Sequence, residues 1–119
     1  PPSIAIMFSL PLYYTKIDLP NGVLLSRLDF TYQDSCSTCE FHIWINRVSL
    51  NPSTIGDDHE VIGHFNTSYS SSNPIRTDHI SLTEVIDNEN FYYLISVGNG
   101  ALPLNPRVQF YNAKATYSY

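Results

Sequence analysis

Residues 91–119 restrict this chain to a small set of folds. They contain two apolar, aromatic segments, FYYLISV and RVQFYNAKATYSY, separated by a stretch rich in Gly, Pro and Asn. Tyr, Phe, Val and Ile favour β-strands, whereas Gly, Pro and Asn favour turns. We expect the two segments to form a strand pair in the middle of a β-sandwich, with the other strands packed against it.

The same strand signal recurs earlier in the chain, where apolar and polar residues alternate with a period of two. It is present in residues 3–10, 23–33, 40–50, 60–69 and 75–86. Turn signals such as Leu-Pro-Asn-Gly at residues 19–22 separate these segments, and none has the apolar stripe of a helix. In residues 23–33 the alternation places an apolar group on one side of the strand, the side expected to face the core, and a polar group on the other: Leu24, Leu28, Phe30 and Tyr32 against Arg27, Asp29 and Thr31. The sequence therefore predicts an all-β fold, an antiparallel, jelly-roll-like β-sandwich of about eight strands in a single domain.

Composition indicates an exported protein. Only 14% of the 119 residues are charged, against about a quarter in an average soluble protein. Ser, Thr, Asn and Tyr must therefore cover much of the surface, as in secreted β proteins and assembly subunits. We expect an extracellular or cell-surface location, with the signal sequence removed. The nine Tyr residues either form interface surfaces or reflect the preference of strands for Tyr.

Charge and motif patterns argue against several functions. The net charge is −5 and the six Lys and Arg residues are scattered, so we expect no nucleic-acid partner. The uncharged run in residues 1–15 is too short to span a bilayer and contains Pro11, so no membrane span is predicted. Nucleophile-elbow, P-loop and dinucleotide-binding patterns are absent, and we therefore predict neither enzymatic activity nor a cofactor.

The N-terminal segment is set apart from the rest of the chain by prolines at positions 1, 2 and 11. Within it Ile4, Ile6, Phe8 and Leu10 share one face of an extended strand. This strand can pair within its own sheet, or it can complete the sheet of a neighbouring copy. We accordingly divide the chain into a possible donor strand, residues 1–11, and a sandwich domain, residues 12–119.

Cys36 and Cys39 are the chain's two cysteines, spaced C-x-x-C between two strand patterns. We predict a β-hairpin across them, with the cysteines in its turn. The ends of a β-turn approach closely enough for a disulfide, so a structural disulfide is the preferred interpretation. A zinc half-site, which would need two ligands from elsewhere, and free or intermolecular thiols are the alternatives.

Two further patterns are weaker. Asp57, Asp58 and His59 form a dense group of ligand-type residues that could hold a calcium ion, but EF-hand spacing is absent. A solvated acidic loop is the preferred interpretation, and we predict no metal site. Asn66 begins an Asn-Thr-Ser triplet, which matches the acceptor pattern for N-glycosylation.

Several motifs carry a resemblance to known proteins. They are the Leu-Pro-Asn-Gly turn at 19–22 and the segments 45–47, 86–88, 92–94 and 110–117, the last reading Phe-Tyr-Asn-Ala-Lys-Ala-Thr-Tyr. In this respect the last hundred or so residues resemble a loosely defined family of bacterial extracellular domains. The resemblance implies a jelly-roll-like sandwich on exported proteins, without an established catalytic role. The Cys-Ser-Thr-Cys stretch departs from the family pattern, which has small polar residues there.

Two functions fit these observations. The first is a non-enzymatic structural subunit of a filament, surface array or appendage, which self-associates through strand edges and Tyr-rich surfaces. The second is a carbohydrate-binding or adhesin module that uses Trp44 and exposed Tyr residues as stacking surfaces. Coverage of the core by Trp44, or a position between subunits, is the preferred interpretation of this residue. If the strand of residues 3–10 pairs within its own sheet, the binding module is favoured. If it pairs with the sheet of a neighbouring copy, the polymer is favoured.

Overall fold

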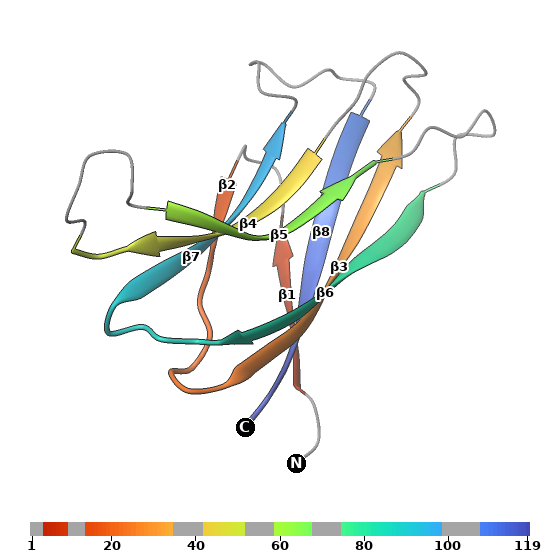
Figure 1. Cartoon of the computed structure of the whole chain (residues 1–119). Coiled ribbons are helices and arrows are strands. Elements are labelled where there is room, and N and C mark those ends of the chain that lie inside the picture. The colour runs from red at the N-terminus through yellow and green to blue at the C-terminus, as the bar shows by residue number, and fades with distance from the viewer. Residues whose placement is uncertain (1–3, 10–13, 35–41, 52–58, 68–74, 99–107) are drawn as a thin grey trace.

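The computed structural model describes residues 4–9, 14–34, 42–51, 59–67, 75–98 and 108–119. These residues form the strands β1 (Ile4–Ser9), β2 (Tyr14–Ile17), β3 (Leu24–Asp34), β4 (His42–Ser49), β5 (His59–Asn66), β6 (Arg76–Val85), β7 (Phe91–Gly98) and β8 (Val108–Ser118). No helix occurs in this part of the chain (Figure 1). The prediction of an all-β chain is confirmed.

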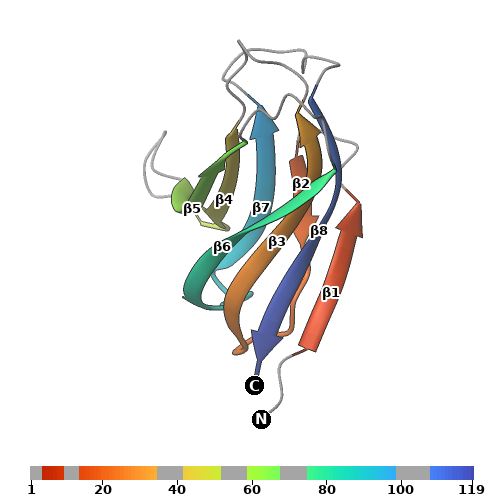
Figure 2. The ribbon, with the colours of Figure 1, turned by 90° about the vertical axis from the view of Figure 1, so that its right-hand side faces the viewer.

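The strands form two antiparallel sheets with the orders β1-β8-β3-β6 and β2-β7-β4-β5. We call the first the β8 sheet and the second the β7 sheet. The two sheets lie face to face as two layers (Figure 2). Apart from the step from β4 to β5, each successive strand lies in the opposite sheet. This alternation is the arrangement of a jelly roll, and the predicted single-domain sandwich is confirmed.

Side chains from both sheets fill the space between the layers. The largest fully buried apolar and aromatic residues are Tyr32, Tyr93, Phe30, Leu25, Leu28, Ile43, Ile45, Ile86, Ile95 and Val23. Most of them alternate along their strands with exposed or half-buried residues, as expected where one face of a sheet packs on the core and the other faces solvent.

The predicted pairing of β7 with β8 is wrong. β7 lies between β2 and β4, whereas β8 lies between β1 and β3 in the other layer. Both strands are central in their own sheets, which accounts for their apolar composition. The same composition fits two central strands of one sheet or of two facing sheets, so it could not identify the partners.

The predicted hairpin between β3 and β4 is also wrong. β3 pairs with β6 and β8, and β4 pairs with β5 and β7. The chain therefore crosses from one sheet to the other between them. A period-two pattern requires only that one face be buried, and two facing sheets meet this requirement as well as a hairpin does. Cys36 and Cys39 lie outside the described residues, so the disulfide remains a prediction.

A β-bulge changes which residues of β3 face the core. The register with both neighbouring strands shifts between Leu25 and Arg27, which makes Ser26 an extra residue. The bulge reverses the alternation on its N-terminal side. Leu25 is fully buried and Leu24 is 37% exposed, so the prediction that Leu24 faces the core is wrong, whereas that for Leu28 and Phe30 is confirmed.

The predicted Leu-Pro-Asn-Gly turn joins two distant parts of the chain. Gly22 has a φ of +86°, which residues with a Cβ rarely adopt, and its N–H donates to the Ile86 carbonyl at 2.8 Å. The Asn88 N–H donates to Asn21 Oδ1 at 2.7 Å, and its side-chain amide donates to the Leu19 carbonyl at 2.8 Å. Two of the motifs that carry the family resemblance are therefore structural turns that contact each other.

β1 is an edge strand that pairs with β8 of the same chain. Ile6 lies opposite Ala115 and Phe8 lies opposite Ala113 in the register. Both alanines are fully buried, and directly opposite residues of an antiparallel pair share a face. The register therefore places large residues of β1 opposite small residues of β8.

Candidate functional site

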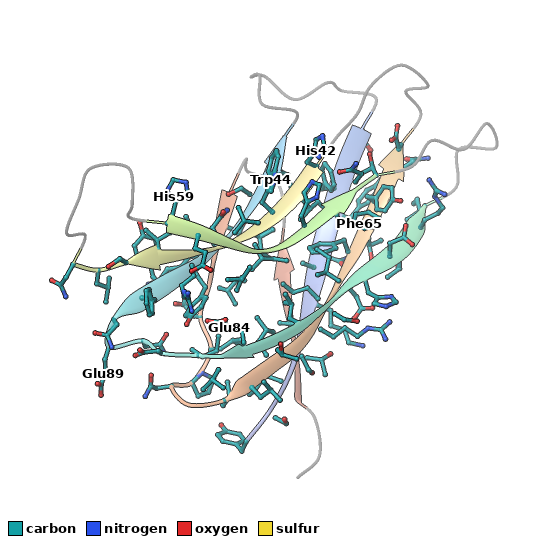
Figure 3. The ribbon with its side chains drawn as sticks, in the orientation of Figure 1. His42, Trp44, His59, Phe65, Glu84 and Glu89 are labelled. Carbon is teal, nitrogen blue, oxygen red and sulfur yellow. The ribbon has the colours of Figure 1, made fainter. Side chains whose placement is uncertain are left out.

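The outer face of the β7 sheet carries an aromatic and polar surface. Ile43 and Ile45 of β4 are fully buried, so the alternation along the strand turns Trp44 to the outer side. In the register Trp44 lies opposite Ser96 of β7 on one side and His64 of β5 on the other. Sequence positions 44, 64 and 96 therefore form one row across three strands. Figure 3 shows Trp44 on this face together with His42 and His59.

Three rings form a cluster at one end of this surface, which we call the ring cluster: His42, Trp44 and His64. Their planes are nearly parallel, at 12° for His42 with Trp44, 17° for the two imidazoles and 25° for Trp44 with His64. The centroids lie 4.9 to 5.8 Å apart. Such a group offers a broad apolar surface with polar ring edges.

The two imidazoles of the ring cluster are hydrogen-bonded to each other. His42 Nδ1 and His64 Nε2 are 2.7 Å apart, and the ring centroids are separated by 4.9 Å with nearly parallel planes. The rings therefore meet edge to edge rather than one above the other. One nitrogen donates its proton and the other accepts it, with the direction set by the tautomers. This bond fixes the orientation of both rings.

A shallow groove continues from the ring cluster along the same face. It has a volume of about 260 Å³, and its lining residues are Asn46, Val48, His59, Tyr92, Leu94 and Ser96. Within it Asn46 Nδ2 donates to Ser96 Oγ at 3.1 Å. A second hollow of about 160 Å³ adjoins it and shares Tyr92. These volumes are smaller than the roughly 300–1,000 Å³ of pockets that enclose a small molecule, so the surface suits a ligand that lies along it.

The ionic groups of β4 and β6 meet on the inner side of the β7 sheet, away from this groove. Arg47 donates to Glu84 Oε2 at 3.2 Å and forms an ion pair with Glu60. Its guanidinium carbon lies 4.6 Å from the centroid of the Phe91 ring. The hydrogen bond to Glu60 raises the pKa of Arg47 above its usual value. Burial raises the pKa of Tyr93, whose hydroxyl donates to Glu84 at 3.3 Å.

A separate polar cluster joins β3 and β6 to Thr67, the residue that follows β5. Asp34 is only 2% exposed, and its Oδ2 accepts a hydrogen bond from Thr67 Oγ1 at 2.8 Å. The Tyr32 hydroxyl donates to Asp78 Oδ2 at 2.6 Å, and the Arg76 guanidinium lies 5.5 Å from the Tyr32 ring centroid. Because these groups bond to one another across strands, we assign them a structural role.

The structure brings only some of the predicted site residues together. Trp44 and His59 share the outer face of the β7 sheet, whereas Asn66 is exposed at the end of β5. Asp57 and Asp58 lie outside the described residues, as does Leu10. Among the residues that the structure does describe, no group of three His, Cys, Asp or Glu side chains is placed to hold a metal ion.

Sequence reasoning missed the two histidines that flank Trp44. Neither His42 nor His64 belongs to a recognised ligand-binding or catalytic motif. The alternation of β4 does place His42 beside Trp44, but His64 reaches them only through the β4–β5 register. Fewer Tyr residues are exposed than expected, since Tyr32, Tyr93 and Tyr117 are buried.

Comparison with protein families and curated proteins assigns no function, so the geometry of the described residues is the basis for a proposal. No protein-family model matches the chain, and no curated protein matches it either. In the described part of the chain, no helix is long and apolar enough to cross a membrane.

Proposed function

We propose that the chain is a non-enzymatic carbohydrate-binding module, acting outside the cell or at its surface. The observation that carries this proposal is the ring cluster, whose nearly parallel rings lie beside a groove with amide, hydroxyl and phenol groups. The C–H face of a sugar ring packs on aromatic rings, and its hydroxyls bond to amide and hydroxyl side chains. Jelly rolls are also a common architecture of lectin domains.

The pairing of β1 supports a module over a polymer. β1 completes its own β8 sheet through six register pairs, from Ile4 with Tyr117 to Ser9 with Asn112. A strand used in this way is not needed to complete a neighbour. From the sequence, a strand of residues 3–10 that pairs within its own sheet was expected to favour a binding module. The pairing of β1 with β8 of the same chain therefore favours binding as the primary function.

A glycan array followed by calorimetry tests this proposal. Replacement of Trp44 with Ala removes the largest ring of the cluster and should weaken binding of the best glycan about tenfold or more, equivalent to about 1.4 kcal/mol or more. Tyr111→Ala is the matched control, since Tyr111 is an exposed aromatic residue of the β8 sheet. An array without hits, or a Trp44→Ala variant that binds as well as the parent, would contradict the proposal.

Self-assembly through β1 is a second candidate, favoured by the position of this strand. β1 forms the edge of its sheet and is bounded in sequence by Pro2 and Pro11. Withdrawal of β1 would leave the edge of β8 unpaired, and the β1 of a second copy could pair there in the same register. Light scattering over a range of concentrations tests this candidate. Regular filaments that form only when residues 1–11 are present would support it. A chain that stays monomeric at every concentration would contradict it.

A further inference from the structure

We infer that the ligand is an uncharged, unbranched glycan with an extended backbone, and that about four of its sugar units lie along β4 and β7 at the same time. This inference rests on the proposed function of the same face and adds the class and length of its ligand. The observations that carry it are the arrangement of the face in rows along β4 and the polar atoms that these rows leave available.

The outer face of the β7 sheet is built from three successive rows of residues, each of which crosses β7, β4 and β5. The register pairs define the rows as Ser96–Trp44–His64, Leu94–Asn46–Val61 and Tyr92–Val48–His59. Trp44 and His59, from the first and the third row, lie apart on this face (Figure 3). The face is therefore longer than the ring cluster, which occupies only its first row and the adjoining end of β4.

The rows combine apolar surface with polar atoms that are available to a ligand. Among the described residues, no hydrogen bond uses the indole N–H of Trp44 or the hydroxyl of Tyr92, and the side chains of Asn46 and Ser96 bond only to each other. The donor in that bond is Asn46 Nδ2, so the Asn46 side-chain oxygen can still accept and the Ser96 hydroxyl can still donate. Since these groups come from all three rows, a ligand can make hydrogen bonds along the whole face.

The two hollows direct the ligand along the strands. The larger one is lined by residues of all three rows, and the smaller one shares Tyr92 and continues to Leu50 and Phe91. From Trp44 to Leu50 the chain advances six residues, up to about 20 Å, which is the length of about four sugar units in an extended glycan. A backbone that coils, such as that of α-1,4-linked glucose, would leave this line after one or two units.

The rows also match a ligand without charge. None of their nine positions holds Asp, Glu, Lys or Arg. A neutral sugar needs only the hydrogen-bonding groups that the rows provide, whereas a permanently charged ligand would gain no ion pair with an acidic residue, Lys or Arg there. Lys16 and Asp18, which line the smaller hollow beyond the rows, form an exposed ion pair with each other at 3.5 Å.

The experiment measures affinity as a function of ligand length. Calorimetry of the full chain uses linear β-1,4-linked oligomers of glucose, mannose, xylose and N-acetylglucosamine, from the single sugar to the hexamer. In at least one series, affinity should rise about tenfold or more from dimer to tetramer and change by only about threefold or less from tetramer to hexamer. The matched control series is α-1,4-linked glucose, which has the same sugar in a coiled backbone and should show no such rise.

A variant at the third row locates the additional contacts. Tyr92→Ala removes the ring and hydroxyl of this row, so the gain from dimer to tetramer should fall to about threefold or less. The dimer itself should bind within about twofold of the parent affinity, because Trp44 in the first row holds it. Tyr111→Ala, in the β8 sheet, is the control and should leave the gain unchanged. Circular dichroism of each variant establishes that it is folded.

The outcomes separate this inference from the proposed function. Dimer and tetramer bound with equal affinity, or a gain with length that Tyr92→Ala retains, would overturn the extended ligand while leaving carbohydrate binding in place. An equal gain in the α-1,4-linked series would overturn the extended backbone, and binding of charged glycans alone would overturn the preference for neutral ones. If no glycan of any length or charge is bound, the carbohydrate-binding function fails, and the inference fails with it.

Discussion

Gly63 shows how a single residue allows the two sheets to close. It lies in β5 opposite Ile45, on the inner side. A Cβ at this position would come within 2.9 Å of both Ile45 Cδ1 and Leu82 Cδ2, and 3.2 Å from Ile80 Cγ2. These side chains belong to both sheets, so the missing Cβ is what allows β5 to approach β6.

We expect Gly63→Val to destabilise the fold by about 1–3 kcal/mol, because a branched side chain overpacks this contact. Urea unfolding of the variant and the parent measures the difference. Val61→Ala, at an exposed position of the same strand, is the control and should change the free energy of unfolding by about 0.5 kcal/mol or less. Equal stability of Gly63→Val and the parent would show that the inner side is not closely packed at β5.

Asp87 is expected to make the turn between β6 and β7 sensitive to acid. Its Oδ2 accepts a hydrogen bond from the Asn90 side chain at 2.9 Å, and its Oδ1 accepts bonds from the N–H groups of Glu89 and Asn90. The bond from the Asn90 side chain is the main cause that lowers the pKa of Asp87 below its usual 3.8. Since the folded-state pKa is the lower one, the stabilisation is complete above the unfolded-state pKa and is lost as the pH falls through the folded-state value.

The test compares the parent with Asp87→Ala across this pH range. The difference in free energy of unfolding should be constant at neutral pH and should shrink as the pH falls below about 4. Chemical unfolding at a series of pH values provides the measurement. A difference that keeps its size down to about pH 2 would show that the carboxylate charge of Asp87 does not contribute.

At the scale of strands, the ion pair between Arg47 of β4 and Glu84 of β6 connects the two sheets. Both side chains are largely buried, with exposed fractions of 27% and 15%. A double-mutant cycle with Arg47→Met and Glu84→Gln should give a coupling energy of about 1 kcal/mol, which decreases with added salt. Lys16 and Asp18, exposed at 59% and 80%, form the control pair and should couple by only a few tenths of a kcal/mol. Equal coupling in the two cycles would contradict the expected role of burial.

The strands were predictable from sequence, whereas their partners were not. The alternation of Ile43 with Trp44 and Ile45 identifies β4 and its two faces, because a strand turns successive side chains to opposite sides. Pairing depends on contacts between segments far apart in the chain, and the same alternation fits a hairpin or two facing sheets. The bulge at Ser26 likewise leaves no clear sign in the sequence. It reverses the exposure of Leu24 and Leu25 through the register alone.

The candidate site was predictable only in part, for the same reason. Trp44 is conspicuous as the chain's one Trp, and the pattern of β4 turns it outward. His64 is twenty residues away and joins it only because β5 pairs with β4 in a particular register. A second bulge, between Ile45 and Asn46, further adjusts that register. The ring cluster is therefore a product of tertiary pairing, which residue spacing does not encode.

At the scale of the whole molecule, the two candidate functions use different layers of the sandwich. The ring cluster and its groove belong to the β7 sheet, and the β1 edge belongs to the β8 sheet. Sites more than about 7–10 Å apart that share no partners usually act independently. Carbohydrate binding and strand exchange can thus coexist in one chain, and each can be disrupted without the other.

This independence gives a prediction for a chain that lacks residues 1–11. Loss of β1 removes its pairing with β8 from Asn112 to Tyr117 and uncovers the buried Ala113 and Ala115, so the truncated chain should be less stable. A synthetic peptide of residues 1–11 should restore its stability. A peptide with Asp in place of Ile6 and Phe8 should not, because these positions pair with the buried Ala115 and Ala113 of β8. Thermal unfolding with and without each peptide measures both effects.

The complemented chain should bind its best glycan within about twofold of the full-length affinity, since the ring cluster lies in the other sheet. Conversely, Trp44→Ala should weaken glycan binding without changing the affinity for the peptide. Calorimetry of the four combinations distinguishes the possibilities. If the peptide does not raise the thermal stability of the truncated chain, β1 is excluded as a means of assembly. Glycan affinity that depends on which peptide is bound would instead show that the two sheets are coupled through the core.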